Sequence, residues 1–479
     1  MVVLKFGGSS VATAEDIARV SDIVFRERRP RAVVVSALGG VTDQLIELAR
    51  LAGAGGLPDA WRRLDAIRAR HRVVAGAIAA PARRLALDAD LDATWRDVQA
   101  LAETSAAAGV CAPPTRDAIV ASGELASSRI VTAFLAQRGL PAVWVDARRV
   151  LVTDGRHGEA APDLDATRGR VRAEIRARIL CLEVPVVGGF VGATPEGATT
   201  TLGRGGSDYS ASLIGACLEA DEVQIWTDTD GVLTADPRVL PQAQTVARLS
   251  YGEAAALAYF GAKVLHPATV APAVATLIPV RVLNAQRPES AGTLITARHG
   301  QRARPLAGIA WRTGLSLMAI ELGPTAGRAA ALAEVTAACA RAGVTLHQAS
   351  VSDTGVALLV EATPAADTVA AHAWTLGRVE RHDGLASVTA VGDALTRDAQ
   401  LAAAVLRSIG RVPLHLVTQT PGACHVSVLV AQRRLARVLA SLHGRFFERD
   451  EYRDHARIDP PESVEPAIDG PADGREVWA

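Results

Sequence analysis

Residues 2–10 read Val2-Val3-Leu4-Lys5-Phe6-Gly7-Gly8-Ser9-Ser10, a short apolar strand that runs directly into a glycine turn. A helix is expected at about residues 14–27, and a second strand at 32–36 enters another Gly-Gly turn. Further short apolar strands are expected at residues 142–146, 184–188 and 222–226. Strands that alternate with helices predict an α/β sandwich with a mainly parallel central sheet. Ligand-binding loops gather at the carboxyl ends of the strands in such a sheet.

Lysine occurs at only two positions in the chain of 479 residues, Lys5 and Lys263, although Lys and Arg together number 51. Each of the two lies within two residues of a glycine. An ammonium is a compact point charge and a guanidinium is a broad planar fork, so they are not interchangeable in a tight space. An ammonium in a glycine-cleared pocket is typical of phosphate binding. The sequence therefore predicts two phosphate-binding lysines, against the alternative of two chance survivors on the surface.

The composition argues against nucleic-acid binding, membrane binding, a disulfide framework and a zinc site. The formal net charge is +0, and arginine is spread along the chain, so neither a nucleic-acid partner nor an anionic membrane is indicated. The five cysteines are widely spaced and form no CxxC pair, which argues against a disulfide framework or a zinc site and favours a reduced cytoplasmic setting. We expect no signal peptide and no transmembrane helix, because no stretch of about 18 apolar residues is present.

A second glycine-rich segment, Thr199-Thr200-Thr201-Leu202-Gly203-Arg204-Gly205-Gly206-Ser207-Asp208-Tyr209-Ser210, surrounds one arginine with glycines. The Arg204 fork suits a substrate carboxylate. Asp208 is placed to orient an ammonium or a lysine, and Ser207 is expected to cap the helix that begins here. The alternative is a glycine-rich turn with a capping Ser-Asp pair.

A third segment, Trp226-Thr227-Asp228-Thr229-Asp230-Gly231-Val232-Leu233-Thr234-Ala235-Asp236-Pro237-Arg238, follows a predicted strand. Its aspartates and threonines suit contacts to ribose and phosphate, made directly or through Mg²⁺. The alternative is an acidic turn in solvent. No side-chain cluster with metal-ligand spacing is predicted anywhere in the chain.

A fourth main segment and two weaker ones support the same site. Residues 259–267 place Lys263 where it suits a transferred phosphoryl group, and His266 beside Pro267 is expected to be structural. Thr42 follows the second strand and suits substrate binding. Glu124 is expected at a helix start, where its carboxylate suits an amino group. Taken alone, the Thr42 and Glu124 segments are each more often a helix cap than a binding site.

The pattern changes near residue 300. Residues 298–305 are polar and basic and are interpreted as a linker. Beyond them the order strand, helix, strand, strand, helix occurs twice, with strands starting at 315 and 387. Two ferredoxin-like βαββαβ units in tandem are typical of a regulatory module. Residues 449–479 are rich in proline and acidic residues, so a disordered tail or a linker is expected, and it could lead into a fused second enzyme.

Through these segments the chain resembles the aspartate kinases of the single-chain, lysine-sensitive branch. The resemblance spans about residues 2–448 and rests on KFGGSS, SGELAS, TTTLGRGGSDYSA, WTDTDGVLTADPR and FGAKVLHPAT in that order. It implies an amino-acid-kinase domain followed by two ACT domains. The implied limits are 1–297 for the kinase domain, 306–384 and 385–448 for the ACT domains, with strand exchange between them left open, and 449–479 for the tail.

The resemblance also implies site residues. Asp208 would organise Lys5 and Lys263 around the ATP phosphates, so these three form the catalytic set. Glu124 would hold the amino group of the substrate and Arg204 its α-carboxylate. The full substrate-binding set is Thr42, Glu124, Arg204, Gly205, Gly206 and Ser207. The ATP-binding set is Lys5, Gly7, Gly8, Ser9, Thr227, Asp228, Val232, Asp236, Lys263 and Val264.

The implied reaction transfers the γ-phosphoryl group of ATP, bound with Mg²⁺, to the β-carboxylate of L-aspartate, in the cytoplasm. This opens the route to lysine, threonine and methionine. The implied regulation is feedback by an amino acid, lysine or threonine, in a homodimer or homotetramer joined through the ACT domains. Ser352 and Asp353 keep part of the family's effector site. Residues 323–330 are small and His347 replaces an acidic residue, so we expect weak feedback or an effector other than lysine alone.

Three other functions remain open at this stage. A glutamate or acetylglutamate kinase is disfavoured by the tandem ACT-like units and by the Arg204 segment. A non-catalytic amino-acid sensor would not require two lysines in glycine pockets. An oxidoreductase is hinted at by Gly53-Ala54-Gly55-Gly56, but these residues are expected at a helix end with no ribose-binding acid after them.

Overall fold

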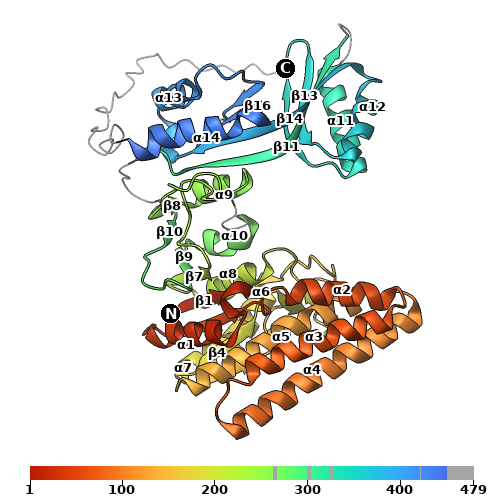
Figure 1. The fold of residues 1–479 in the computed structure, drawn as a ribbon, viewed down its shortest axis with the longest axis vertical. Helices are drawn as coiled ribbons and strands as arrows, with labels where there is room; N and C mark the ends of the chain where they lie inside the picture. The colour runs from red at the N-terminus through yellow and green to blue at the C-terminus, as the bar shows by residue number, and fades with distance from the viewer. Residues whose placement is uncertain (263–266, 299–303, 324–326, 421, 450–479) are drawn as a thin grey trace, which may run out of the picture.

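The computed structural model describes residues 1–262, 267–298, 304–323, 327–420 and 422–449 of the chain. It contains two large sheets, one in each half of the chain (Figure 1). The first half forms the wide lower part of the view, and the second half forms the upper part. Lys263, Val264 and His266 lie outside the described residues, as do residues 450–479 of the predicted tail.

The first sheet has the strand order β3-β4-β2-β1-β7-β9-β10-β8. All neighbouring strands run parallel except β10, which is antiparallel to β9. This confirms the predicted α/β class with a mainly parallel sheet. The strands are β1 Val2–Phe6, β2 Arg31–Val35, β3 Ala142–Val145, β4 Val184–Gly188, β7 Glu222–Thr227, β8 Arg248–Ser250, β9 Val280–Asn284 and β10 Thr293–Thr296. A separate hairpin pairs β5 Val191–Ala193 with β6 Thr199–Thr201.

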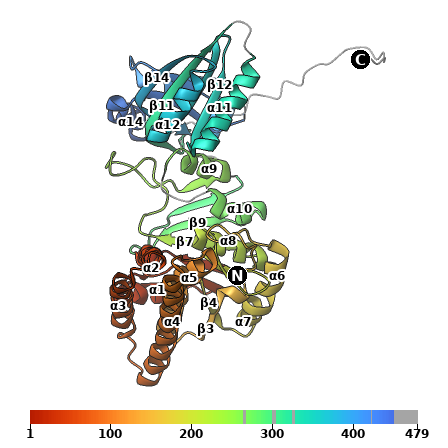
Figure 2. The ribbon, with the colours of Figure 1, turned by 90° about the vertical axis from the view of Figure 1, so that its right-hand side faces the viewer.

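Helices cover both faces of this sheet (Figure 2). On one face, α1 to α5 pack over a core that includes Phe6 and Trp95. On the other face, α6, α8 and α10 pack over a second core that includes Ile214 and Val280. The helices are α1 Ala14–Arg26, α2 Val41–Gly53, α3 Leu57–Ala75, α4 Pro81–Ala108, α5 Pro113–Gln137, α6 Leu164–Val171, α7 Ala177–Leu180, α8 Gly206–Leu218, α9 Tyr251–Tyr259 and α10 Pro267–Ala275.

Helix α5 is the central helix of the first half. It contacts α2, α4, β4 and β6. By length and composition α5 is apolar enough to cross a membrane, but 83% of its most apolar window is buried inside the protein. Such burial is typical of a core helix, because the apolar side chains already have protein neighbours.

The second sheet has the order β12-β13-β11-β14-β16-β15 and is antiparallel. Its two central strands, β11 and β14, are each 15 residues long and pair from Gly308↔Val391 to Leu322↔Gly377. Each strand therefore serves both βαββαβ units. The elements are β11 Gly308–Leu322, α11 Arg328–Ala342, β12 Leu346–Val351, β13 Gly355–Glu361, α12 Pro364–Ala373, β14 Gly377–Val391, α13 Ala399–Ile409, β15 Leu416–Thr418, β16 His425–Ala431 and α14 Leu435–His443.

The predicted strand starts at 315 and 387 were wrong by seven and ten residues, since β11 begins at Gly308 and β14 at Gly377. The reason is that both strands continue through the junction of the two units. β14 also runs through the limit expected between residues 384 and 385, so the two units share one sheet. The domain limits stay predictions.

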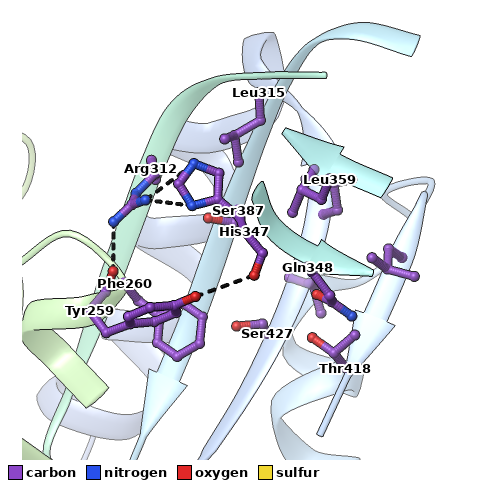
Figure 3. Close-up of a pocket in the computed structure, with 13 residues that line it drawn as sticks. Tyr259, Phe260, Arg312, Leu315, His347, Gln348, Leu359, Ser387, Thr418 and Ser427 are labelled. Atoms are coloured by element: carbon purple, nitrogen blue, oxygen red, sulfur yellow. Dashed lines mark hydrogen bonds between the residues drawn. The ribbon is translucent and has the colours of Figure 1, made fainter. Parts of the chain in front are cut away.

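Helix α9 joins the two halves, and we call its contacts with the second sheet the α9 joint (Figure 3). At its C-terminal end, Arg312 Nη2 donates to the Tyr259 carbonyl at 2.6 Å and Arg312 Nη1 donates to His347 Nδ1 at 2.7 Å. Tyr259 Oη donates to the His347 carbonyl at 3.3 Å. At its N-terminal end, Glu253 Oε1 accepts from the Asp393 backbone N–H at 2.9 Å. Only about 30 Å³ of space remains in the joint.

Candidate functional site

A cavity of about 690 Å³ opens at the carboxyl ends of β1, β2 and β4. This is where a parallel sheet places its ligand-binding loops. The predicted residues that line the cavity are Lys5, Gly8, Thr42, Glu124, Arg204, Gly205, Gly206, Ser207 and Asp208. They come from β1, α2, α5 and the turn into α8, so segments up to about 200 residues apart in the chain meet here.

Lys5 and Asp208 form an ion pair at the floor of the cavity. Lys5 Nζ lies 2.6 Å from Asp208 Oδ1, and Lys5 is only 8% exposed. Lys5 is on β1, with Val34 and Ile225 as its register neighbours on the flanking strands. Asp208 is in the first turn of α8. A buried ammonium that keeps one carboxylate partner is positioned rather than free to move, as phosphate binding requires.

Two glycine turns form the side of the cavity next to Lys5. The Gly39 backbone N–H donates to the Gly8 carbonyl at 3.0 Å. A Cβ on Gly8 would lie 3.0 Å from the Ala37 carbonyl oxygen, so any larger residue would push the turns after β1 and β2 apart. A Cβ on Gly7 would contact Lys5 Nζ at 3.6 Å, so Gly7 lies directly beside the ammonium group.

The start of α8 differs from the prediction. Helix α8 begins at Gly206 with Gly205 as its N-cap, and no side chain caps it, so Ser207 is not the cap. Gly205 has φ +68, a left-handed conformation that favours glycine. A Cβ on Gly206 would lie 2.7 Å from Phe190 Cδ2, which leaves no room for a larger residue. The start of α8 therefore lies at the cavity wall with no side chain capping it.

Glu124 lies in the middle of α5 and not at a helix start as predicted. Gly123 allows this placement, because its Cβ would be only 3.0 Å from Ala37 Cβ. Glu124 is 3% exposed, and its Oε1 accepts from the Ala37 backbone N–H at 3.2 Å. Burial raises the pKa of Glu124 to about 8, although hydrogen bonds from Ala37 and Thr42 oppose the shift.

The second carboxylate oxygen of Glu124, Oε2, is buried and has no hydrogen-bond partner among the described residues. Unpartnered buried polar atoms are rare in folded proteins, and at a cavity wall they are typical of ligand sites. A cationic donor from a ligand would satisfy this oxygen and favour its ionised form.

Sequence reasoning missed Asp117, which also lines the cavity. It is 1% exposed and accepts from four donors: Gly158 N at 2.9 Å, Thr201 N at 3.1 Å, Thr201 Oγ1 at 3.0 Å and His157 Nδ1 at 3.0 Å. Its spacing from Glu124 was an available signal, since residues seven apart lie on the same face of a helix.

The predicted nucleotide residues are only partly gathered at the cavity. Gly7, Ser9, Thr227, Asp228, Val232 and Asp236 do not line it. Thr227 ends β7, which is paired with β1, so the loop after it begins beside the glycine turn. Within the loop, Asp236 is held by Arg238 at 2.5 Å, and the buried Val232 donates its N–H to Thr293. Lys263 and Val264 lie outside the described residues.

The predicted effector residues, Ser352 and Asp353, lie in the turn between β12 and β13. Ser352 Oγ accepts from the Gly355 backbone N–H at 3.1 Å, which is a turn-stabilising contact. The Asp353 carbonyl accepts from the Arg328 guanidinium of α11. Their role in effector binding stays a prediction. Across the part of the chain that the structure describes, no three His, Cys, Asp or Glu residues gather as a metal site.

Residues 1–284 match the Amino acid kinase family. The chain belongs to this family. Among curated proteins it is 33% identical to lysine-sensitive aspartokinase 3 of Escherichia coli, over 94% of this chain and 99% of that protein. It is 32% identical to the chloroplastic aspartokinase 1 of Arabidopsis thaliana, over 93% of this chain and 80% of that protein. It is therefore a family member of the aspartokinase type.

Solved structures agree. The crystal structure of E. coli aspartokinase III in complex with aspartate and ADP matches with a TM-score of 0.78 and 32% identity, over 93% of this chain and 100% of that one. The same enzyme in complex with lysine and aspartate matches with a TM-score of 0.80. The match spans both halves of the chain, so the two sheets belong to one known architecture.

Proposed function

We propose that this protein is an ATP-dependent aspartate kinase that phosphorylates the β-carboxylate of L-aspartate to give 4-phospho-L-aspartate. The observation that carries the proposal is the cavity in which the Lys5–Asp208 ion pair and the unpartnered Glu124 oxygen face the same space. Such a cavity offers a cation for phosphate and an anion for an ammonium group. Relatives of similar length are aspartokinases, one of them solved with aspartate and ADP.

The charges of the cavity match the substrate. Glu124 accepts the ammonium group of aspartate through Oε2, and Arg204 at the cavity rim pairs with the α-carboxylate. The β-carboxylate is then left to face Lys5 and the start of α8. Thr42 and Ser207 line the cavity between these groups and suit hydrogen bonds to the substrate.

The reaction needs positioning rather than a general base. One oxygen of the β-carboxylate, already ionised at neutral pH, attacks the γ-phosphorus of ATP. The bond from that phosphorus to the bridging oxygen of ADP breaks, and ADP leaves with the electron pair. Because an anion must approach a polyanion, Lys5, the backbone N–H groups of the glycine turns and the α8 start supply most of the stabilisation.

We assign Lys263, Val264 and the loop after β7 to ATP binding on the resemblance given above. Mg²⁺ is usually held by substrate phosphates with one or two carboxylates. We expect the ion to arrive on ATP and to neutralise its phosphates.

The effector, the oligomeric state and the cellular location are also proposals. One relative is named lysine-sensitive, and the same E. coli enzyme was solved with lysine. In this chain His347 is held by Arg312 in the α9 joint, so that side chain is occupied without an effector. We infer an amino-acid effector that lysine alone does not satisfy, a homodimer or homotetramer joined through the second sheet, and a cytoplasmic location.

The test is hydroxamate trapping of the acyl phosphate with ATP and one amino acid. Aspartate should give a hydroxamate, while glutamate and N-acetylglutamate should give at most a trace. A glutamate-dependent product with no aspartate signal would replace the proposal with another amino acid kinase. Repeating the assay with lysine, threonine and methionine identifies the effector.

A further inference from the structure

We infer that Asp117 is a positioning residue that sets the location of the Arg204 turn relative to Glu124, and thereby the affinity for the α-carboxylate of the substrate. The inference rests on the function proposed above. Asp117 and Glu124 are both on α5, seven residues apart, so they share one face of one rigid helix.

The Asp117 carboxylate joins α5 to two separate segments of the cavity rim. Its Oδ2 accepts from Gly158 N and His157 Nδ1 in the loop before α6, and from Thr201 N on β6. Its Oδ1 accepts from Thr201 Oγ1. A carboxylate can only accept here, so His157 Nδ1 carries the hydrogen. The two contacts with Thr201 are buried and the other two are partly buried, and such bonds are strengthened by low exposure to water.

Both segments are connected to the Arg204 turn, one through the chain and the other through contact. Thr201 is followed by Leu202, Gly203 and Arg204 in sequence. Gly203 has φ +73, and a Cβ there would lie 3.2 Å from the Gly158 carbonyl oxygen. The turn therefore rests against the same loop that Asp117 holds. Asp117 fixes both the root of the turn and the surface on which the turn lies.

Asp117 itself is not free to bind a ligand. Four donors from the protein already occupy its oxygens, whereas Glu124 Oε2 has none among the described residues. The two carboxylates on one face of α5 thus have different roles. Glu124 contacts the ammonium group, and Asp117 holds the frame that carries the guanidinium.

The test compares two substrates in steady-state kinetics. L-Aspartate carries an α-carboxylate, and L-aspartic acid α-amide keeps the ammonium and β-carboxylate groups but presents a neutral α-group. With Asp117→Ala, kcat/KM for aspartate should fall by about tenfold or more, because charged hydrogen bonds that hold the turn are lost. The same variant should change kcat/KM for the amide by about twofold at most, and KM for ATP should stay within about twofold.

Two further variants keep the test decisive if Asp117→Ala folds poorly. Thr201→Val removes only the Thr201 Oγ1 contact and should raise KM for aspartate about threefold, with a lower melting temperature but an intact fold. Asp117→Asn keeps an acceptor for the Oδ2 donors and should restore most of the aspartate affinity.

Asp398→Ala is the matched control. Asp398 caps helix α13, which belongs to the half of the chain that contains the second sheet. It accepts from Gln400 N at 2.8 Å and Leu401 N at 3.1 Å. Its loss should lower the melting temperature and leave both KM values unchanged. Equal losses on aspartate and amide in the Asp117 and Thr201 variants would overturn the inference, as would no loss on either. A wild-type protein that phosphorylates neither substrate would instead show that the proposed function is wrong.

Discussion

The cavity at Lys5 and the α9 joint each contain charged side chains, and the two regions differ in how far those charged groups are paired. In the joint, the Arg312 guanidinium is taken up by Tyr259 and His347, and about 30 Å³ of space remains. In the cavity of about 690 Å³, Glu124 keeps an oxygen without a partner among the described residues. A buried polar atom that lacks a hydrogen-bond partner and faces a large cavity is typical of a binding site. Charged side chains that are paired with each other across a nearly filled space are typical of a structural contact.

The largest effect should come from Lys5→Arg. A broad guanidinium cannot reproduce the compact charge that Lys5 Nζ places 2.6 Å from Asp208, so kcat should fall by more than about 100-fold while the fold is kept. Hydroxamate production measures kcat, and circular dichroism measures whether the fold is kept. Arg62→Lys is the matched control, because Arg62 is 80% exposed on α3 and should keep full activity. Near-wild-type turnover in Lys5→Arg would remove the basis for a phosphate role.

The next effect should come from Glu124→Gln. Loss of the carboxylate that accepts the ammonium group should raise KM for aspartate by about 30- to 100-fold, the size of a charged hydrogen bond. KM for ATP should stay unchanged. Thermal unfolding without ligand at pH 8 should show the variant to be at least as stable as wild type, because it no longer buries an ionising group. A variant with normal aspartate KM would show that Glu124 does not touch the substrate.

The wild-type pH dependence follows from the same residue. The pKa of Glu124 is about 8 because the group is buried, so it is mostly protonated below that pH in the ligand-free protein. An ammonium ligand needs the ionised form. KM for aspartate should therefore fall about tenfold per pH unit between pH 6 and 7, as far as Glu124 alone titrates. Glu124→Gln should lose this slope, and a slope that survives in it would assign the titration to another group.

The same shift affects folding. An acid whose folded pKa is raised binds more protons in the native state than in the unfolded state between pH about 4.5 and 8. The free energy of unfolding of the ligand-free protein should therefore decrease as pH rises through that range, as far as Glu124 contributes. Denaturant unfolding of wild type and Glu124→Gln at pH 5, 6.5 and 8 isolates this contribution by difference.

The joint should show a smaller effect of opposite sign. Burial lowers the pKa of His347, and the Arg312 charge adds to the shift, while Glu361 opposes it. Folding thus disfavours the protonated form of His347, and the stabilising contribution of the neutral form is lost as pH falls below about 6.5. His347→Gln should flatten the stability curve between pH 6.5 and 5 and leave aspartate KM unchanged. An equal curve in both proteins would show that folding does not lower the pKa of His347.

The smallest effect should come from Tyr259→Phe. It removes one hydrogen bond of 3.3 Å at a half-exposed position of the joint, so the free energy of unfolding should fall by about 0.5 kcal/mol. Activity without effector should not change. A large loss of activity would mean that the joint takes part in the reaction, and the contrast with the cavity would no longer hold.

Strand position was predictable for β1, β2, β4 and β7, because a buried parallel strand is a short apolar run that ends in a turn residue. Residues far apart, Lys5 and Asp208 among them, were assigned to one site by their chemistry, and the structure brings these two within 2.6 Å. The extent of β11 and β14 was not predictable, since their added residues pair with a distant strand and carry no local signal.

Two local interpretations failed for a common reason. Ser207 was expected to cap α8, but the close approach of Phe190 to Gly206 and the left-handed Gly205 place the N-cap two residues earlier, at Gly205. Glu124 was expected at a helix start, but the glycine beside it permits close packing inside α5. Asp117 was missed because its four donors come from segments about 40 and 84 residues away, which only the fold brings together.

The most direct test of the account is calorimetric titration of aspartate at pH 7 in buffers of different ionisation enthalpy. The account predicts the release of close to one proton per aspartate bound in wild type and almost none in Glu124→Gln, because the ammonium group displaces the proton that burial keeps on Glu124. Binding of aspartate by wild type without proton release would contradict it.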